Sequence, residues 1–365
     1  MLLATPCRTV DPGRVGTGTV HVMQTWTIVG ELATAPGGDG PSPVLARADL
    51  ADVTGWTPKE HGWCRGAECR PTSLLGDAAT AAELPADTVA HLLGAAYAID
   101  EEHRIVVIGS CRDQDTTLHS GIAPDVELWG VDGERHRVFE RHRDRTLVVA
   151  FASWCGCRYD LPGWNALRDE LAGSGFEVVA VAIDERVEDA APWAEGIDVP
   201  VLVDTERTFA DAYGLVNVPT VLWVDADRRV VRRPATEFSD DQFTSVHGVE
   251  SGPHLDAVRR WVLDGVLPEA PDRPGRELGL LDEDQLRARA EFRLAVELAR
   301  RGMTEAAEAR VAVADALAPD DFTIWRAGMQ LVGQDPFGAE FFERYTEWQQ
   351  RHGGPLQVVA GEEHP

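Results

Sequence analysis

The sequence predicts an α/β fold, a central mixed sheet flanked by helices, between a small α+β region and an all-helical extension. Buried apolar runs at 147–151 and 176–184 are separated by a helical pattern, and a helical crossover makes two strands parallel. The first run leads directly into Cys155 and Cys157, after which a helical pattern begins. A helix N-terminus favours a thiolate through its free N–H groups and its dipole, so this turn predicts redox chemistry.

The composition excludes several partners. With 365 residues and 44% hydrophobic residues, the chain can form about two or three domains with ample core. A formal charge of -27 argues against binding nucleic acid or anionic membranes. No apolar run approaches ~18 residues, so we expect no membrane insertion. The start, MLLATPCRTVDPG, lacks the basic and apolar regions of a signal peptide, so we expect a cytoplasmic location.

The N-terminal third is expected to contain two parts. Residues 1–40 form an extension with one β-like run, 19–29, and a Gly/Pro-rich end that resembles a linker. Residues 41–117 form a small α+β, adaptor-like domain with a faint internal repeat. The two copies, DLADVTGW and TVAHLLGA, each read as a short helix stopped by glycine and followed by extended sequence. A hairpin turning after Asp100 follows the second copy.

Two cysteines of the first copy, Cys64 and Cys69, lie with His61 in HGWCRGAECRP. Such a C-x₄-C pair with a nearby histidine could hold a metal. A closed zinc site needs four ligands, however, and no second cysteine pair stands at a suitable spacing. We therefore favour a disulfide under oxidation, or two free thiols, and predict no metal site. Cys111 is interpreted as a small, semi-buried residue.

Residues 118–268 are expected to form the redox domain. It begins with a strand near 123–128 and a turn at Asp132-Gly133. The further elements are, in order, the central strand 146–151, a helix from Cys157 to Ala172, a strand 176–184, a helix 187–196, a strand 199–204, a helical segment 206–214, a hairpin 218–233 and a closing helix 254–265.

This order resembles the thioredoxin superfamily, and most closely its TlpA-like, AhpC/TSA-type redoxin branch. Four segments carry the resemblance: APDVELWGVDG (123–133), FASWC (151–155), CRYDLP (157–162) and YGLVNVPT (213–220). The resemblance implies a thioredoxin-like fold and a thiol–disulfide oxidoreductase that needs no cofactor. Its expected partners are a protein or small molecule carrying a disulfide and an external thiol reductant.

The cysteine motif departs from the branch. The branch has C-x-x-C, whereas this sequence has Cys155-Gly156-Cys157, one residue shorter. The resemblance implies that Cys155 attacks and that Cys157 resolves the mixed disulfide. Gly156 supplies backbone freedom to close the smaller ring, and a strained ring would be more oxidising. The alternative is that the pair does not close, and that another molecule resolves Cys155.

Other site residues follow from the same resemblance. It implies that Pro219 is cis and lies beside the sulfurs, leaving backbone near Val218 free to pair with a substrate chain. An ordinary trans proline at a strand edge is the alternative. Trp154 forms an apolar platform or serves packing alone. Asp160 relays protons if burial raises its pKa, or it only complements the helix N-terminus. We expect Arg158 to face solvent.

The remainder of the chain is less specific. The stretch 235–253, with His247, either reaches the active-site face or covers the sheet edge. Residues 277–352 read as a tetratricopeptide-like unit turning at Gly302, with further helices at 321–332 and 337–351, before a tail at 353–365. Because one such repeat cannot form a binding solenoid alone, packing on the redox domain is favoured over peptide binding.

Two rival functions stay open. A thiol peroxidase with an antioxidant role would need P-x-x-x-[TS]-x-x-C, but VVAFASWC lacks the proline, and Ser153 stands two residues before Cys155 rather than three. A non-catalytic scaffold is the other alternative. Mutation of Cys155 would leave a scaffold unaffected.

Overall fold

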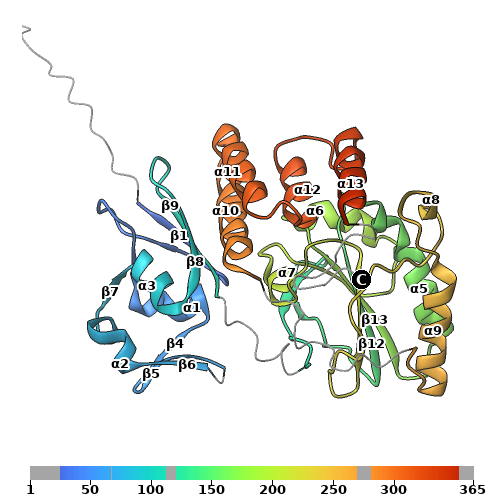
Figure 1. Ribbon diagram of the computed structural model, residues 1–365. Helices are drawn as coiled ribbons and strands as arrows, with labels where there is room; N and C mark the ends of the chain where they lie inside the picture. The colour runs from blue at the N-terminus through green and yellow to red at the C-terminus, as the bar shows by residue number, and fades with distance from the viewer. Residues whose placement is uncertain (1–24, 67, 112–120, 269–280, 353–365) are drawn as a thin grey trace, which may run out of the picture.

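The computed structural model describes residues 25–66, 68–111, 121–268 and 281–352, which form three regions (Figure 1). The first part of the β-like run 19–29 and the tail 353–365 lie outside these residues. An N-terminal α+β region and the redox domain lie on either side of the view, and the C-terminal helices lie along both. No helix among the described residues is long and apolar enough to cross a membrane.

A four-stranded sheet, in the order β2-β1-β9-β8, forms the centre of the N-terminal region. Its strands are β1 (Thr27–Val29), β2 (Thr34–Pro36), β8 (Ala95–Asp100) and β9 (Ile105–Cys111). β1 pairs in parallel with β9, although about 75 residues separate them in the chain. The expected division at residue 40 therefore does not match the sheet, because β1 and β2 pair with strands of the following segment.

Two short helices carry the internal repeat. α1 (Leu50–Thr54) and α3 (Ala86–Leu93) each end at a glycine in the left-handed conformation, Gly55 and Gly94. This is the glycine stop that the repeat predicted. The other elements are β3 (Val44–Ala46), η1 (Arg47–Asp49), β4 (Thr57–Lys59), β5 (Gly62–Arg65), β6 (Glu68–Pro71), α2 (Thr72–Leu75), η2 (Gly76–Ala79) and β7 (Glu83–Pro85).

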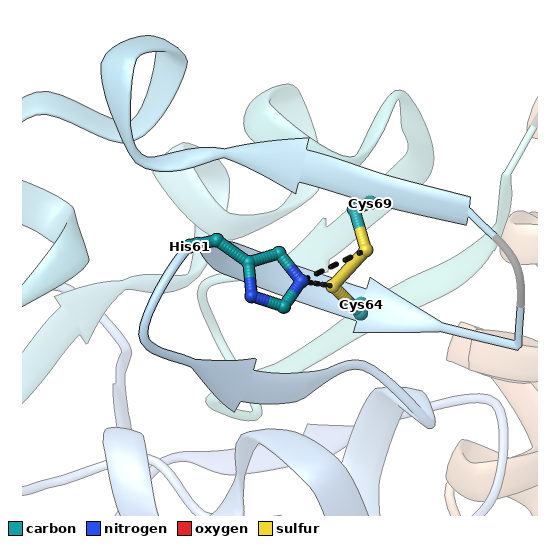
Figure 2. Close-up of side chains that lie close together, drawn as sticks. All are labelled: His61, Cys64 and Cys69. Atoms are coloured by element: carbon teal, nitrogen blue, oxygen red, sulfur yellow. Dashed lines mark hydrogen bonds between the residues drawn. A yellow bond between two sulfur atoms is a disulfide. The ribbon is translucent and has the colours of Figure 1, made fainter.

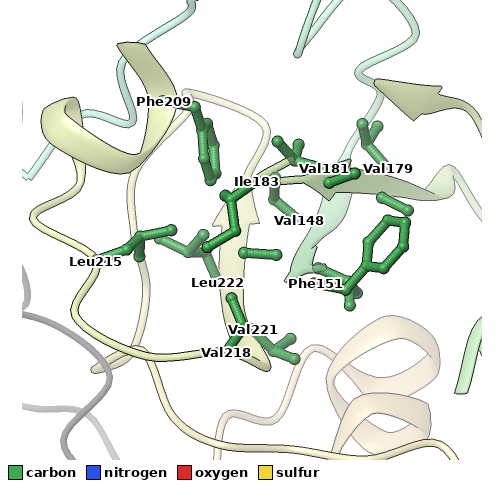
Figure 3. Packing of buried hydrophobic residues seen from close by; sticks show 14 of the residues in the cluster. Val148, Phe151, Val179, Val181, Ile183, Phe209, Leu215, Val218, Val221 and Leu222 are labelled. Carbon is green, nitrogen blue, oxygen red and sulfur yellow. The ribbon is translucent and has the colours of Figure 1, made fainter. Parts of the chain in front are cut away.

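The redox domain has a thioredoxin-like mixed sheet in the order β11-β10-β14-β13-β12-β15. The predicted parallel pairing of the two buried strands, β12 and β13, is confirmed, and β15 runs antiparallel to β12. Figure 3 shows the core between these strands, including Val148, Val181 and Leu222. The strands are β10 (Glu127–Gly130), β11 (Arg135–Arg137), β12 (Arg145–Phe151), β13 (Phe176–Ala182), β14 (Val201–Val203) and β15 (Thr220–Asp225).

Several predicted elements have different limits. The helix expected from Cys157 is a 3₁₀ turn, η3 (Gly156–Asp160), followed by α5 (Leu161–Glu170) with a proline in its first turn. The second arm of the hairpin 218–233 is held near Val230 by an isolated bridge to Val224 and is not a full strand. The other helices are α6 (Val187–Ala190), η4 (Ala191–Ala194), α7 (Thr208–Ala212), α8 (Thr244–His247) and α9 (Ser251–Asp264).

Four helices form the C-terminal extension: α10 (Glu283–Arg300), α11 (Thr304–Leu317), α12 (Phe322–Leu331) and α13 (Ala339–His352). The chain reverses between α10 and α11 at Gly302, as predicted, where φ is +77°. α10 packs on β8 and β9, whereas Ile324 and Ala327 of α12 join the core of the redox domain. The extension therefore packs on both other regions. Its likeness to a tetratricopeptide unit rests on sequence alone.

Candidate active site

The turn after β12 brings together the predicted thiols. Cys155 is the N-cap of η3, and the backbone N–H of Cys157 donates to its sulfur at 3.4 Å. Both are free thiols, and both are buried. The peptide between Val218 and Pro219 is cis, and the Val218 carbonyl oxygen lies 3.7 Å from the Cys155 sulfur. The strand-to-helix turn and the proline loop thus meet at the Cys155 sulfur.

The two thiols differ in their affinity for a proton. Burial opposes ionisation of Cys155, but a hydrogen bond from Cys157 and the charge of Arg326 together lower its pKa to about 6. Burial and the hydrogen bond to Cys155 raise the pKa of Cys157 well above its ordinary value. Near neutral pH, one thiolate therefore lies beside one protonated thiol, which is the asymmetry that nucleophilic attack and later resolution require.

Arg326 was not predicted from the sequence. It comes from α12, is 2% exposed, and donates to the Trp154 carbonyl oxygen at 3.2 Å and to the Pro336 carbonyl oxygen at 3.0 Å. Its guanidinium lies 5.0 Å from the ring centre of Trp154 and 4.1 Å from that of Phe341. One signal could have found it: Arg326 is the only charged residue in the otherwise apolar or neutral helix FTIWRAGMQL.

Asp160 lies at the end of η3 and is 3% exposed. Its carboxylate accepts hydrogen bonds from the backbone N–H groups of Ser239 at 2.8 Å and Asp240 at 3.3 Å. Burial raises the pKa of Asp160 to about 7 despite these bonds, and its charge contributes to the raised pKa of Cys157. The carboxyl group can therefore gain or lose a proton near neutral pH, as the relay interpretation requires.

An aromatic pocket opens over the thiols. It is lined by Cys155, Gly156, Cys157, Asn217, Val218, Pro219, Thr236, Phe238, Phe243, Val246, His247, Val249, Arg326, Phe337, Phe341 and Tyr345. The stretch 235–253 therefore reaches the active-site face, whereas the sequence did not decide between this position and the sheet edge. The C-terminal helices also line the pocket. A Cβ on Gly156 would lie 3.3 Å from the Phe243 ring and 3.5 Å from the Phe337 ring, so a larger residue would crowd the pocket.

The neighbouring polar residues take structural roles. Arg158 donates to the carbonyl oxygens of Ser153 at 2.8 Å and Cys155 at 3.2 Å, and its guanidinium lies over the rings of Tyr159 and Trp193. The sequence led us to expect Arg158 to face solvent, but it is half-buried against these rings. Ser153 also donates to Asp184 through its N–H and its hydroxyl.

The other described cysteines lie outside this site. Cys64 and Cys69 form a disulfide, one of the two favoured interpretations. Cys111 is buried at the end of β9, and burial raises its pKa to about 12, so it is an inert thiol.

The geometry of the site and the comparisons with known proteins together define the class of protein to which the redox domain belongs. The cysteine pair follows the parallel strand β12, stands at the start of a helical turn and lies beside a cis-proline. These features make the redox domain a member of the thioredoxin superfamily. The model of the AhpC/TSA family matches residues 120–233. This domain is therefore a redoxin of that superfamily.

The chain is similar to "Thiol-disulfide oxidoreductase ResA" of Geobacillus thermodenitrificans, with 27% identity over 111 residues, 30% of this chain and 64% of the relative. It is similarly related to the ResA of Bacillus subtilis, with 25% identity over 113 residues, 30% of this chain and 63% of that one. The chain thus spans less than two thirds of these relatives. A solved structure, a putative thiol:disulfide interchange protein DsbE from Chlorobium tepidum, matches with 23% identity and a TM-score of 0.33, covering 40% of this chain and 95% of that one.

Proposed function

We propose that this protein is a thiol–disulfide oxidoreductase of the TlpA-like type, with Cys155 as nucleophile and Cys157 as resolving thiol. The observation that carries the proposal is the opposite displacement of their two pKa values, with that of Cys155 at about 6. A thiolate is available for attack at neutral pH, and its neighbour keeps the proton until the mixed disulfide has formed.

The reaction proceeds in two exchanges. The Cys155 thiolate attacks one sulfur of the substrate disulfide, forms a mixed disulfide, and releases the other sulfur as a thiolate that takes a proton. Cys157 then loses its proton to Asp160, whose pKa of about 7 suits a base at neutral pH, and attacks Cys155. The C-G-C disulfide forms, and the second substrate sulfur leaves as a thiolate that takes the proton from Asp160. An external thiol reductant returns two electrons and two protons to the pair.

The residues that line the pocket support a proposal about the class of substrate. Val218 and Pro219 present the backbone beside the Cys155 sulfur, and Gly156 lines the same pocket. Trp154 is buried beneath the guanidinium of Arg326 and is not among the residues that line the pocket. The rings of Phe243, Phe337, Phe341 and Tyr345 line the approach. We propose that the substrate is an extended peptide, or a small molecule, in which apolar groups flank the disulfide, because these groups would be removed from water in the pocket.

The test uses the full chain and two matched cystine peptides, one with apolar and one with polar residues beside the disulfide. Cys157→Ser should trap the apolar peptide as a mixed disulfide on Cys155, identified by mass spectrometry. Cys155→Ser should abolish reduction of the peptide, and Cys111→Ser should leave it unchanged. Absence of peptide reduction by the wild-type chain itself, with no mixed disulfide trapped on Cys155, would support a scaffold. Consumption of hydrogen peroxide through a Cys155 sulfenic acid, without peptide exchange, would support the peroxidase.

The cellular location is a separate proposal. We retain the cytoplasm, where reducing conditions hold pairs such as Cys155 and Cys157 as free thiols. The Cys64–Cys69 disulfide is instead typical of an oxidising compartment. Alkylation of thiols in intact cells, followed by fractionation and mass spectrometry of these peptides, distinguishes the two locations.

A further inference from the structure

A second cluster of chemically active side chains lies in the N-terminal region, in a different domain from the Cys155 thiol (Figures 1 and 2). His61, Cys64 and Cys69 bring one ring nitrogen and two sulfurs within 4.8 Å of one another. The His61 Nε2 lies 3.3 Å from the Cys64 sulfur and 3.6 Å from the Cys69 sulfur. We propose that these three residues form a redox-gated metal site: closed as a disulfide, and able to bind Zn²⁺ when the disulfide is reduced.

The backbone holds the three donors in place. Cys64 and Cys69 stand directly opposite each other on β5 and β6, and His61 precedes β5 in the turn from β4. That turn is tied to the end of β6, because the Thr72 N–H donates to the His61 carbonyl oxygen at 3.0 Å. A Cβ at Gly62 would lie 2.0 Å from the Arg70 carbonyl oxygen, so glycine is needed for this close approach.

The distances fit one shared ion. Bonds of about 2.3 Å from zinc to sulfur and about 2.0 Å to nitrogen, at tetrahedral angles, place nitrogen about 3.5 Å from each sulfur. The observed 3.3 and 3.6 Å bracket this value. Only the two sulfurs must separate, to about 3.8 Å in the same geometry, and breaking their bond permits that movement. Two thiolates and an imidazole are a preferred set for Zn²⁺, and water takes the fourth position, for which the sequence offered no protein ligand.

The exposure of the donors suggests how the site opens. His61 is exposed, Cys69 is half-buried and Cys64 is buried. A dithiol reductant would attack the accessible Cys69 sulfur, and Cys64 would leave as a thiolate beside the His61 ring. The second reductant thiol then displaces Cys69, so the reductant becomes a disulfide while this pair gains two electrons and two protons. Binding of Zn²⁺ releases both thiol protons to solvent.

The test measures metal binding by the full chain carrying Cys155→Ser and Cys157→Ser, so that the redox pair cannot contribute ligands. The reduced protein should bind one equivalent of Co²⁺ with thiolate-to-cobalt charge-transfer absorption, and excess Zn²⁺ should displace it. The oxidised protein, and a variant that also carries Cys64→Ser and Cys69→Ser, should show no such absorption. His61→Ala should weaken binding by at least ~10-fold. His91→Ala, at an exposed histidine on α3 of the same region, should leave it unchanged.

A second measurement needs no substitution. Zn²⁺ should protect Cys64 and Cys69 from iodoacetamide in the reduced wild-type chain, as mapped by peptide mass spectrometry, while it leaves the labelling of unfolded protein unaffected. The proposal fails if the reduced protein binds no Co²⁺, if the absorption persists without Cys64 and Cys69, if His61→Ala binds as tightly as its parent, or if Zn²⁺ leaves both cysteines open to alkylation.

Discussion

Arg326 donates a hydrogen bond to the carbonyl oxygen of Trp154 at 3.2 Å, with its guanidinium 5.0 Å from the centre of the Trp154 ring. These residues lie 172 positions apart, one in the C-terminal helices and the other just before Cys155. The contact places a buried positive charge beside Cys155 and contributes to its lowered pKa. The helical extension is therefore part of the redox site rather than an appendage to it.

The first prediction concerns this charge. Replacing Arg326 with Met removes a cation that favours the Cys155 thiolate, so the pKa of Cys155 should rise by about one unit or more. The measurement is the pH dependence of iodoacetamide alkylation of Cys155. Arg326→Lys should restore most of the shift. Arg344→Met, at an α13 arginine paired with Asp315, is the matched control and should leave the profile unchanged.

A second prediction compares two buried cysteines of the same chain. Alkylation of Cys155 should increase with pH through a midpoint near 6, because only the thiolate reacts. Cys111, whose pKa burial raises to about 12, should stay unlabelled over the same range. Equal labelling of the two, or a Cys155 midpoint at the ~8.5 of a free thiol, would contradict the assignment of Cys155 as nucleophile.

The pocket gives a third prediction. Gly156→Ala places a methyl group 3.3 Å from the Phe243 ring, and Phe337→Ala removes an apolar wall. Gly156→Ala should reduce the rate of peptide reduction, whereas Phe337→Ala should raise KM for the apolar cystine peptide several-fold with little effect on the polar one. Leu263→Ala, an exposed apolar residue on α9, is the control for general effects. Equal losses on both peptides would contradict apolar selection.

Stability should depend on pH in an unusual direction. Burial raises the pKa values of Asp160, Asp184, Glu185 and Asp204 to about 7, from 3.8 for aspartate and 4.5 for glutamate. Between about pH 4 and 7 the folded protein therefore binds more protons than the unfolded chain. The free energy of unfolding should fall as pH rises through this window.

Asp204→Asn tests that sign. The amide carries no titratable proton, and its oxygen can keep the hydrogen bond that the Ala210 N–H donates to Asp204 at 2.8 Å. The variant should lose about 1–3 kcal/mol of the pH-dependent change in stability, measured by denaturation at pH 5 and pH 8. Asp169→Asn, at an exposed position on α5, should keep the parental slope. Greater stability of the wild type at pH 8 than at pH 5 would disprove the prediction.

The last prediction concerns a buried ionic junction between the three regions. Arg289 of α10 donates to Asp211 at 2.6 Å and to Asp321 at 3.0 Å, and Ser110 of β9 donates to Asp211 at 2.7 Å. Arg289→Ala leaves buried carboxylates without their cation, so it should cost roughly 3–5 kcal/mol in chemical denaturation. Arg259→Ala breaks an exposed pair with Glu170 and should cost at most ~1 kcal/mol. Similar losses for both would contradict the role of burial.

The sequence predicted the parts of the fold that depend on neighbouring residues. Three such features each depend on a short segment of sequence: the apolar runs of β12 and β13, the glycine stops at Gly55 and Gly94, and the reversal at Gly302. The cis bond at Pro219 followed from a resemblance rather than from local physics, and the structure agrees. The predicted limits of elements differed from the observed ones where a proline or a long-range strand pair intervened, as in η3 and β1.

By itself, then, the sequence determined the redox turn, with two thiols and an acidic residue at the start of a helix. The tertiary structure alone decided what surrounds it. Arg326 and Phe337 reach the thiols from distant segments, and Ser239 donates to Asp160. The carbonyl oxygen of Leu215, before the cis-proline, accepts from Arg289 of α10. Short patterns specify helices and strands because those depend on nearby residues. The charge beside Cys155 arises from packing between domains, which no local pattern records.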